Sequence, residues 1–116
     1  TYLIGTCAII TEYDTEIVFQ SHLFKIRIKT PRKGLNPFLL LAILTSPVVQ
    51  RQVRAKQFTQ DIIDSLGERL HELVLPVPKS AHKRKKITDM VKEAVYQRVK
   101  SRNLAQEARL AVASAQ

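Results

Sequence analysis

The stretch from residue 79 to residue 116 contains neither proline nor glycine. Ser80 is a suitable N-cap, and the residues after it favour one helix over 81–113, close to 50 Å long at about 1.5 Å per residue. Apolar residues recur along it at spacings of one to five: Ile87, Met90, Val91, Ala94, Val95, Val99, Leu104, Ala108 and Val112. A narrow apolar seam on a long polar helix needs a partner helix for stability. The sequence therefore predicts a coiled-coil-like rod.

The middle of the chain is basic. Between Gln20 and Gln60 there is no Asp or Glu, and the cations of this window are Lys25, Arg27, Lys29, Arg32, Lys33, Arg51, Arg54 and Lys56. The window is also rich in core-type residues, and the whole chain has a net charge of +9. A folded basic surface favours a polyanion, so nucleic acid is the leading partner. A membrane surface is a weaker alternative, because no bulky aromatic face lies opposite the cations.

Several segments before residue 79 have the composition of strands, namely 1–10, 16–20, 22–29, 62–63 and 73–75. In 22–29, Phe24, Ile26 and Ile28 alternate with cations. This alternation favours an antiparallel strand with one solvated face, and a strand that lays its cations against phosphates is the second interpretation. We expect an α/β (α+β) mixed globule with antiparallel strands and two short helices, followed by the long C-terminal helix.

The two short helices have clear start signals. Asn36 followed by Pro37 predicts a helix through Leu44, and Ser46-Pro47 predicts a second over 48–56. In the second helix Val49 and Val53 are four residues apart and mark the buried side. A helical turn is expected over 66–72. The chain then divides into a globule over 1–78 and a helix over 79–116.

No catalytic constellation is present. His22, His71 and His82 lack metal-ligand spacing, and the single Cys7 excludes an internal disulfide and favours a buried, inert thiol. We therefore expect no enzyme activity, no metal and no cofactor in this chain. The run His82–Lys86 is typical of a solvated face or a targeting patch, with DNA contact as an alternative. No apolar run is long enough to cross a bilayer, and a strand-like start at Thr1 favours a fragment of a longer protein.

The order of these elements resembles the DNA target recognition domain of type I restriction–modification specificity subunits. It is equally similar to the related domain fused to N6-adenine DNA methyltransferases. The strongest matches are the Asn-Pro-Phe-Leu helix start at Asn36–Leu39 and the Leu-Pro-Val-Pro segment at Leu75–Pro78 before the long helix. The resemblance covers the whole chain, as the second half of a recognition domain plus its spacer helix. The family's usual Glu-Gln pair is replaced by the stretch 80–86, which is compatible with the methyltransferase-fused branch.

The resemblance implies a cytoplasmic module that reads a short double-stranded DNA sequence in the major groove. It implies that the long helix pairs antiparallel with an equivalent helix, from a second copy or a second recognition domain. Methyl transfer from S-adenosylmethionine to adenine, or cleavage, would belong to a partner methyltransferase or restriction subunit or domain. The chain itself would then hold no cofactor.

The residues suggest how such a module would bind DNA. We expect phosphate contacts from Lys29, Arg32, Lys33, Arg51, Arg54 and Lys56, with Lys25 and Arg27 on the same basic surface. We expect base contacts from Gln57, Thr59 and Gln60, because glutamine suits adenine edges. Two alternatives stay open: a scaffold in which the long helix drives oligomerisation, and an RNA-binding module.

Overall fold

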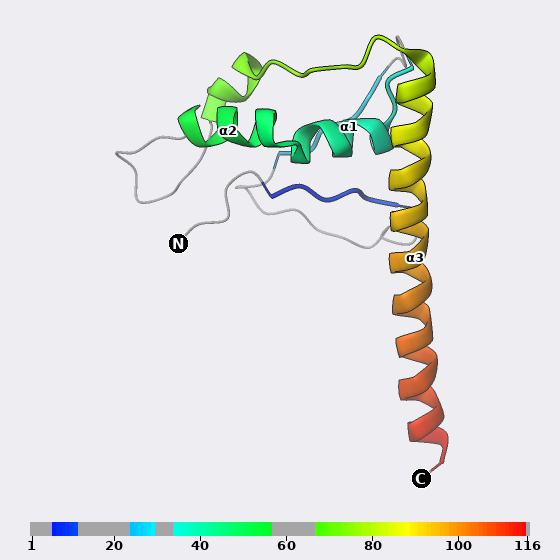
Figure 1. Cartoon of the computed structure of the whole chain (residues 1–116). Helices are drawn as coiled ribbons and strands as arrows, with labels where there is room; N and C mark the ends of the chain where they lie inside the picture. Colours follow the sequence, from blue (N-terminus) through cyan, green and yellow to red (C-terminus); the bar gives the residue numbers. More distant parts are fainter. Residues whose placement is uncertain (1–5, 12–23, 30–33, 57–66, 116) are drawn as a thin grey trace.

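The computed structural model describes residues 6–11, 24–29, 34–56 and 67–115 (Figure 1). Its elements are α1 (Pro37–Thr45), α2 (Pro47–Lys56), a 3-10 helix η2 (Gly67–Glu72) and α3 (Ala81–Ser114). Helix α1 packs against the N-terminal half of α3, α2 continues from the far end of α1, and the C-terminal half of α3 projects past both (Figure 1). The molecule measures 55 × 43 × 24 Å. Its shape is that of a small helical body attached to one end of a rod.

Helix α1 begins where the sequence predicts. The side chain of Asn36 accepts a hydrogen bond from the N–H of Leu39 at 2.9 Å, and Pro37 occupies the first turn. Both devices satisfy or remove N–H groups that have no partner within the helix. The helix is apolar on nearly every side and buries Leu39, Leu40 and Ile43. A helix of this composition is stable only inside a packed body, which α2 and α3 supply.

The corner between α1 and α2 is closed by side chains. Ser46 donates to the carbonyl of Ile43 through its N–H at 3.1 Å and its hydroxyl at 2.6 Å. The Gln50 amide donates to the carbonyl of Leu44 at 2.7 Å. These bonds satisfy the last carbonyl groups of α1, which have no partner within the helix. The corner is thereby fixed, and it places Val49 and Val53 of α2 in the same core as Leu39 and Ile43 of α1.

The core lies between α1, α2 and the start of α3. It consists of Leu39, Ile43, Val49 and Val53, each nearly or completely buried. Half-buried side chains pack around it: Leu35, Leu44, Leu70, Leu73, Leu75, Val77 and Ile87. Burying a side chain of this size contributes roughly 1.5–3 kcal/mol, so this cluster accounts for most of the cohesion of the described body.

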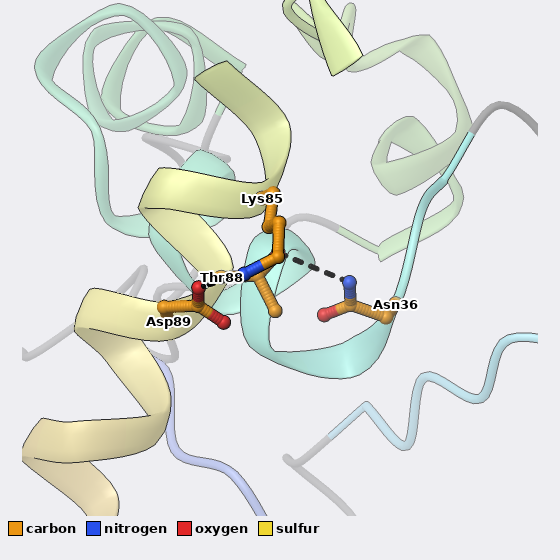
Figure 2. A network of polar contacts seen from close by, with 4 residues as sticks. All are labelled: Asn36, Lys85, Thr88 and Asp89. Atoms are coloured by element: carbon orange, nitrogen blue, oxygen red, sulfur yellow. Dashed lines mark hydrogen bonds and ion pairs between the residues drawn. The ribbon is translucent and has the colours of Figure 1, made fainter. Parts of the chain in front are cut away.

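A polar contact joins α1 to α3 beside the core. The Asn36 Nδ2 donates to the hydroxyl of Thr88 at 3.1 Å (Figure 2). Thr88 is 7% exposed and is the buried polar residue of α3. A buried hydroxyl without a partner would be costly, so this bond fixes how α3 sits against the first turn of α1.

The predicted antiparallel strands are wrong for the described residues. Segments 6–11, 24–29 and 73–75 contain no strand there, and the described chain is helical rather than α/β. In 24–29 the alternation does not produce a buried face, because Phe24 is 51% and Ile26 49% exposed. At 73–75 the backbone of Val74 bonds a side chain instead of a strand: Gln52 accepts from its N–H and donates to its carbonyl, each at 2.8 Å. The predicted strands at 1–5, 16–20, 22–23 and 62–63 lie outside the described residues.

The predicted helices are confirmed, but the apolar seam of α3 is divided. Ile87, Val91, Val95 and Val99 are half-buried on the side that faces the body. The remaining seam residues are exposed: Met90, Ala94, Leu104, Ala108 and Val112. Every described residue from 100 to 115 is exposed. Among the described residues, the first half of α3 is therefore stabilised by packing against its own chain, whereas the second half is exposed to solvent.

Candidate nucleic-acid interface

Helix α2 presents two of the predicted phosphate-binding residues to solvent. Val49 and Val53 fix its inner side, at 0% and 4% exposure. At about 100° of rotation per residue, Arg51 and Arg54 fall on the opposite side, and both are exposed. The Nε of Arg51 donates to the carbonyl of Pro47 at 3.3 Å, which orients that guanidinium along the helix. The two cations therefore lie together on the outer face of a helix anchored in the core.

The segment 24–29 supplies the second group of cations. Lys25, Arg27 and Lys29 are all exposed, while Ile28 is half-buried. The segment is irregular rather than a strand, so no sheet supports these cations. Its half-buried residue is Ile28. They lie on a separate element from the arginines of α2.

The remaining predicted site residues are placed only in part or not at all. Lys56 ends α2, and its side chain lies outside the description. The predicted phosphate contacts Arg32 and Lys33, and the predicted base contacts Gln57, Thr59 and Gln60, lie outside the described residues.

The basic run at the start of α3 is not a uniform patch. The guanidinium of Arg84 turns inward, and its Nη1 donates to the carbonyls of Pro78 at 2.8 Å and Lys79 at 2.7 Å. It also covers Gly34, where an added Cβ would lie 2.9 Å from the Arg84 Nε. Arg84 therefore holds the entry to α3 in place.

The neighbouring cation Lys85 is also engaged. Its Nζ lies 2.7 Å from a carboxylate oxygen of Asp89, one turn further along α3 (Figure 2). This hydrogen bond and the charge of Asp89 raise the pKa of Lys85. The same hydrogen bond lowers the pKa of Asp89, with help from the charges of Lys85 and Lys92. Of the run, His82, Lys83 and Lys86 are left as exposed basic side chains.

A shallow groove of about 630 Å³ runs along α3 beside the first turn of α1. Its floor is mainly apolar, with Phe38, Val95 and Val99, and its edges include Tyr96 and Lys100. The ammonium of Lys92, another lining residue, lies 5.5 Å from the centre of the Phe38 ring in a cation–π contact. The groove therefore lies between α3, the first turn of α1 and residues 9–11.

Cys7 is half-buried, and burial raises the pKa of its thiol, which makes the nucleophilic thiolate scarce at neutral pH. No three side chains of His, Cys, Asp or Glu in the described ranges are grouped as a metal site would require. Among the same residues, every helix is too short or too polar to cross a bilayer.

Two structural residues were not predicted. Gln52 binds the backbone of Val74, a role that no local pattern signals because its partner lies 22 residues away. The structural role of Arg84 was not predicted either, because Arg84 stands within a run of cations, although the two carbonyls that accept its hydrogen bonds lie just before the helix.

No protein-family model, no curated protein and no solved structure matches this chain. Its functional assignment therefore depends on the residues described above.

Proposed function

We propose that this chain is a double-stranded DNA recognition module of a restriction–modification system. It would direct adenine methylation or cleavage performed by another domain or subunit, which would bind S-adenosylmethionine where methylation is the reaction. A recognition module of a bacterial restriction–modification system would work in the cytoplasm, where the DNA lies. The observation that carries the proposal is the pair Arg51 and Arg54 on the outer face of α2, within a window free of acidic residues.

The packing of α2 supports phosphate binding by this pair. The inner face of the helix is buried through Val49 and Val53, so the arginines are carried on a rigid support. Guanidinium groups bind phosphate oxygens in a bidentate manner, and rigid support lowers the entropy lost on binding. The exposed cations Lys25, Arg27 and Lys29 extend the positive charge of the described surface.

The test compares two double variants that remove the same charge. In the first, Arg51 and Arg54 are both changed to Ala; in the second, Lys79 and Lys83, at the start of α3, are both changed to Ala. Binding to a duplex is measured by fluorescence anisotropy over a range of salt concentrations. Since each neutralised phosphate contributes about 0.9 to the slope of log K against log salt, the first variant should lower the slope by about 2. The second should leave the slope nearly unchanged.

Unchanged affinity and slope in the Arg51/Arg54 variant would remove these residues from the interface. Competition between the duplex and a structured RNA at matched salt separates DNA from RNA recognition. Preference for the RNA would favour the RNA-binding alternative.

A second candidate function, self-association through α3, is favoured by the exposed side of that helix. We define the outward stripe as the residues that alternate at spacings of four and three along this side: Met90, Ala94, Gln97, Ser101, Leu104, Ala108 and Ala111. All are exposed, and Met90 and Leu104 are 64% and 55% exposed. The alternation is that of a coiled-coil seam, and its small residues permit close approach of a second helix.

Charges beside the outward stripe favour an antiparallel second copy. Glu93, Lys100 and Glu107 flank the stripe on one edge at intervals of seven, and Lys86 precedes them by seven. In an antiparallel pair centred near Tyr96 and Gln97, Glu93 would face Lys100 of the second copy. Lys86 would face Glu107 of the second copy in the same register. A parallel pair would not bring these opposite charges together, so charge selects the orientation.

Leu104→Asp and Leu110→Asp are matched variants for this candidate. Both leucines are exposed on the projecting half of α3, at 55% and 62%, but only Leu104 belongs to the outward stripe. Sedimentation velocity should show concentration-dependent association of the wild type, its loss in Leu104→Asp and its retention in Leu110→Asp. Equal association of all three proteins would reject pairing through the stripe. Val91 and Val95 are unsuitable for this test, because they pack against the same chain.

A further inference from the structure

The side of α3 that faces the body changes its chemistry halfway along the helix. Val91 and Val95 are half-buried on this side. One heptad further on, the corresponding positions are Arg98 and Arg102, and Arg109 lies a further heptad on. Seven residues correspond to nearly two full turns, so the three arginines continue the direction of the packed valines. We call these three residues the arginine face.

The arginine face lies where α3 has left the body. Arg98, Arg102 and Arg109 are exposed, as is the whole described stretch from 100 to 115. Figure 1 shows the C-terminal half of α3 running past the level of α1 and α2, so that rod and body form two sides of a corner. By helical geometry the arginine face continues the direction of Val91 and Val95 along the rod, next to the groove that Val95 and Val99 line beside Phe38.

The acidic residues of α3 lie on a different side of the helix from the arginine face. Asp89, Glu93 and Glu107 are the carboxylates of the helix, and at about 100° per residue they all fall within one sector. That sector lies opposite, or nearly opposite, the arginine face. The segregation leaves the arginine face without a carboxylate of α3 along about 16 Å, the rise from Arg98 to Arg109 at about 1.5 Å per residue.

We infer that the arginine face is a second nucleic-acid contact, which binds the phosphate backbone of the duplex engaged by α2. This inference rests on the proposed function and adds residues outside the basic window to it. The side chains are all arginine, whose planar guanidinium binds phosphate oxygens with two parallel hydrogen bonds. Arg98 and Arg102 are about 6 Å apart along the axis, which suits contacts to nearby phosphates of one strand. The rod would thus act as a clamp arm beside the body.

The experiment compares two triple variants of equal charge change in the full chain. One replaces Arg98, Arg102 and Arg109 with Ala. The control replaces Lys79, Lys83 and Lys85, which lie at or just before the start of α3, with Ala. All six side chains are exposed, and alanine is the best helix former, so both variants should retain the wild-type circular dichroism spectrum. Duplex binding is measured against salt for both, for the wild type and for the Arg51/Arg54 double variant.

We expect the arginine-face variant to bind the duplex at least about tenfold more weakly and to lose about 2.7 from the salt slope, since three phosphate contacts are removed. The lysine control should change the slope by less than about 1. Equal losses in both triple variants would overturn the inference, because net charge alone would explain them. An unchanged slope in the arginine-face variant, with a loss in the Arg51/Arg54 variant, would overturn it while leaving the proposed function intact.

Two further outcomes bear on the ligand. If the wild type binds no duplex even at low salt, the proposed function fails and the inference fails with it. Polyglutamate serves as an acidic polypeptide probe without phosphate. Binding of polyglutamate as tightly as the duplex, with the same dependence on the arginine face, would overturn phosphate recognition in favour of an acidic protein partner.

Discussion

Asn36 and Thr88 are joined by a hydrogen bond of 3.1 Å across 52 residues of sequence. The same Asn36 side chain accepts the N–H of Leu39 and so caps α1. One side chain therefore starts the buried helix and attaches it to the rod (Figure 2). This coupling connects the position of α2, which α1 carries, to the position of α3. Both candidate DNA contacts depend on it.

Asn36→Ala should destabilise the fold by about 2–3 kcal/mol, since it removes a helix cap and leaves the buried Thr88 hydroxyl without its donor. Thr88→Val should cost about 1 kcal/mol, because the cap is retained. Urea denaturation of both single variants and the double variant measures the coupling. Ser80→Ala is the control, since Ser80 caps α3 through the N–H of Lys83 without a cross-helix bond. A strictly additive double variant would contradict the coupled role.

Gly34→Ala should destabilise the chain by roughly 1–2 kcal/mol, because Gly34 has a φ of +70°, where a Cβ is strained. The new Cβ would also displace the Arg84 side chain, 2.9 Å away. Thermal denaturation checks the loss. Gly34→Asn should cost less, since asparagine tolerates this backbone region. When Gly34→Ala is made in an Arg84→Ala background, the loss of stability due to the clash with Arg84 should vanish, and the loss due to backbone strain should remain. If Gly34→Ala then cost no stability at all, backbone strain at this position would be absent.

Gln52→Ala should release the backbone of Val74, because both hydrogen bonds of 2.8 Å are lost. Since Val74 is 71% exposed, water can replace these bonds, and the loss of stability should be about 1 kcal/mol. Amide hydrogen exchange at Val74 should accelerate, whereas Gln50→Ala, which acts on the α1–α2 corner, should leave it unchanged. Unaltered exchange at Val74 in the Gln52 variant would contradict the pairing.

Asp89 should titrate below its ordinary pKa of 3.8, mainly because Lys85 donates a hydrogen bond to its carboxylate. A lowered pKa in the folded state means that the carboxylate stabilises the helix above the unfolded pKa and loses this contribution as pH falls through the folded value. The pair is fully exposed, so the effect on folding should be small and weakened by salt. NMR titration checks the pKa, which should return toward 3.8 in Lys85→Ala. An identical pKa in that variant would contradict the assignment.

Much of the helical framework could be predicted from the sequence because its signals are local. Asn36-Pro37, Ser46-Pro47 and Ser80 set helix starts through bonds to residues only three or four positions away. The charge pattern was equally readable, since it is a property of composition. These signals placed α1, α2 and α3, and they placed Arg51 and Arg54 on the outer side of α2.

Whether an alternating segment became a strand was decided by tertiary structure. A strand requires a second backbone beside it, and alternation in 24–29 says nothing about whether one is present. The backbone of Val74 found a partner in Gln52, which no nearby residue signals. The division of the α3 seam was also hidden, because residues such as Val95 and Leu104 have similar apolar character. Only the position of the body determines which of them it covers and which it leaves exposed.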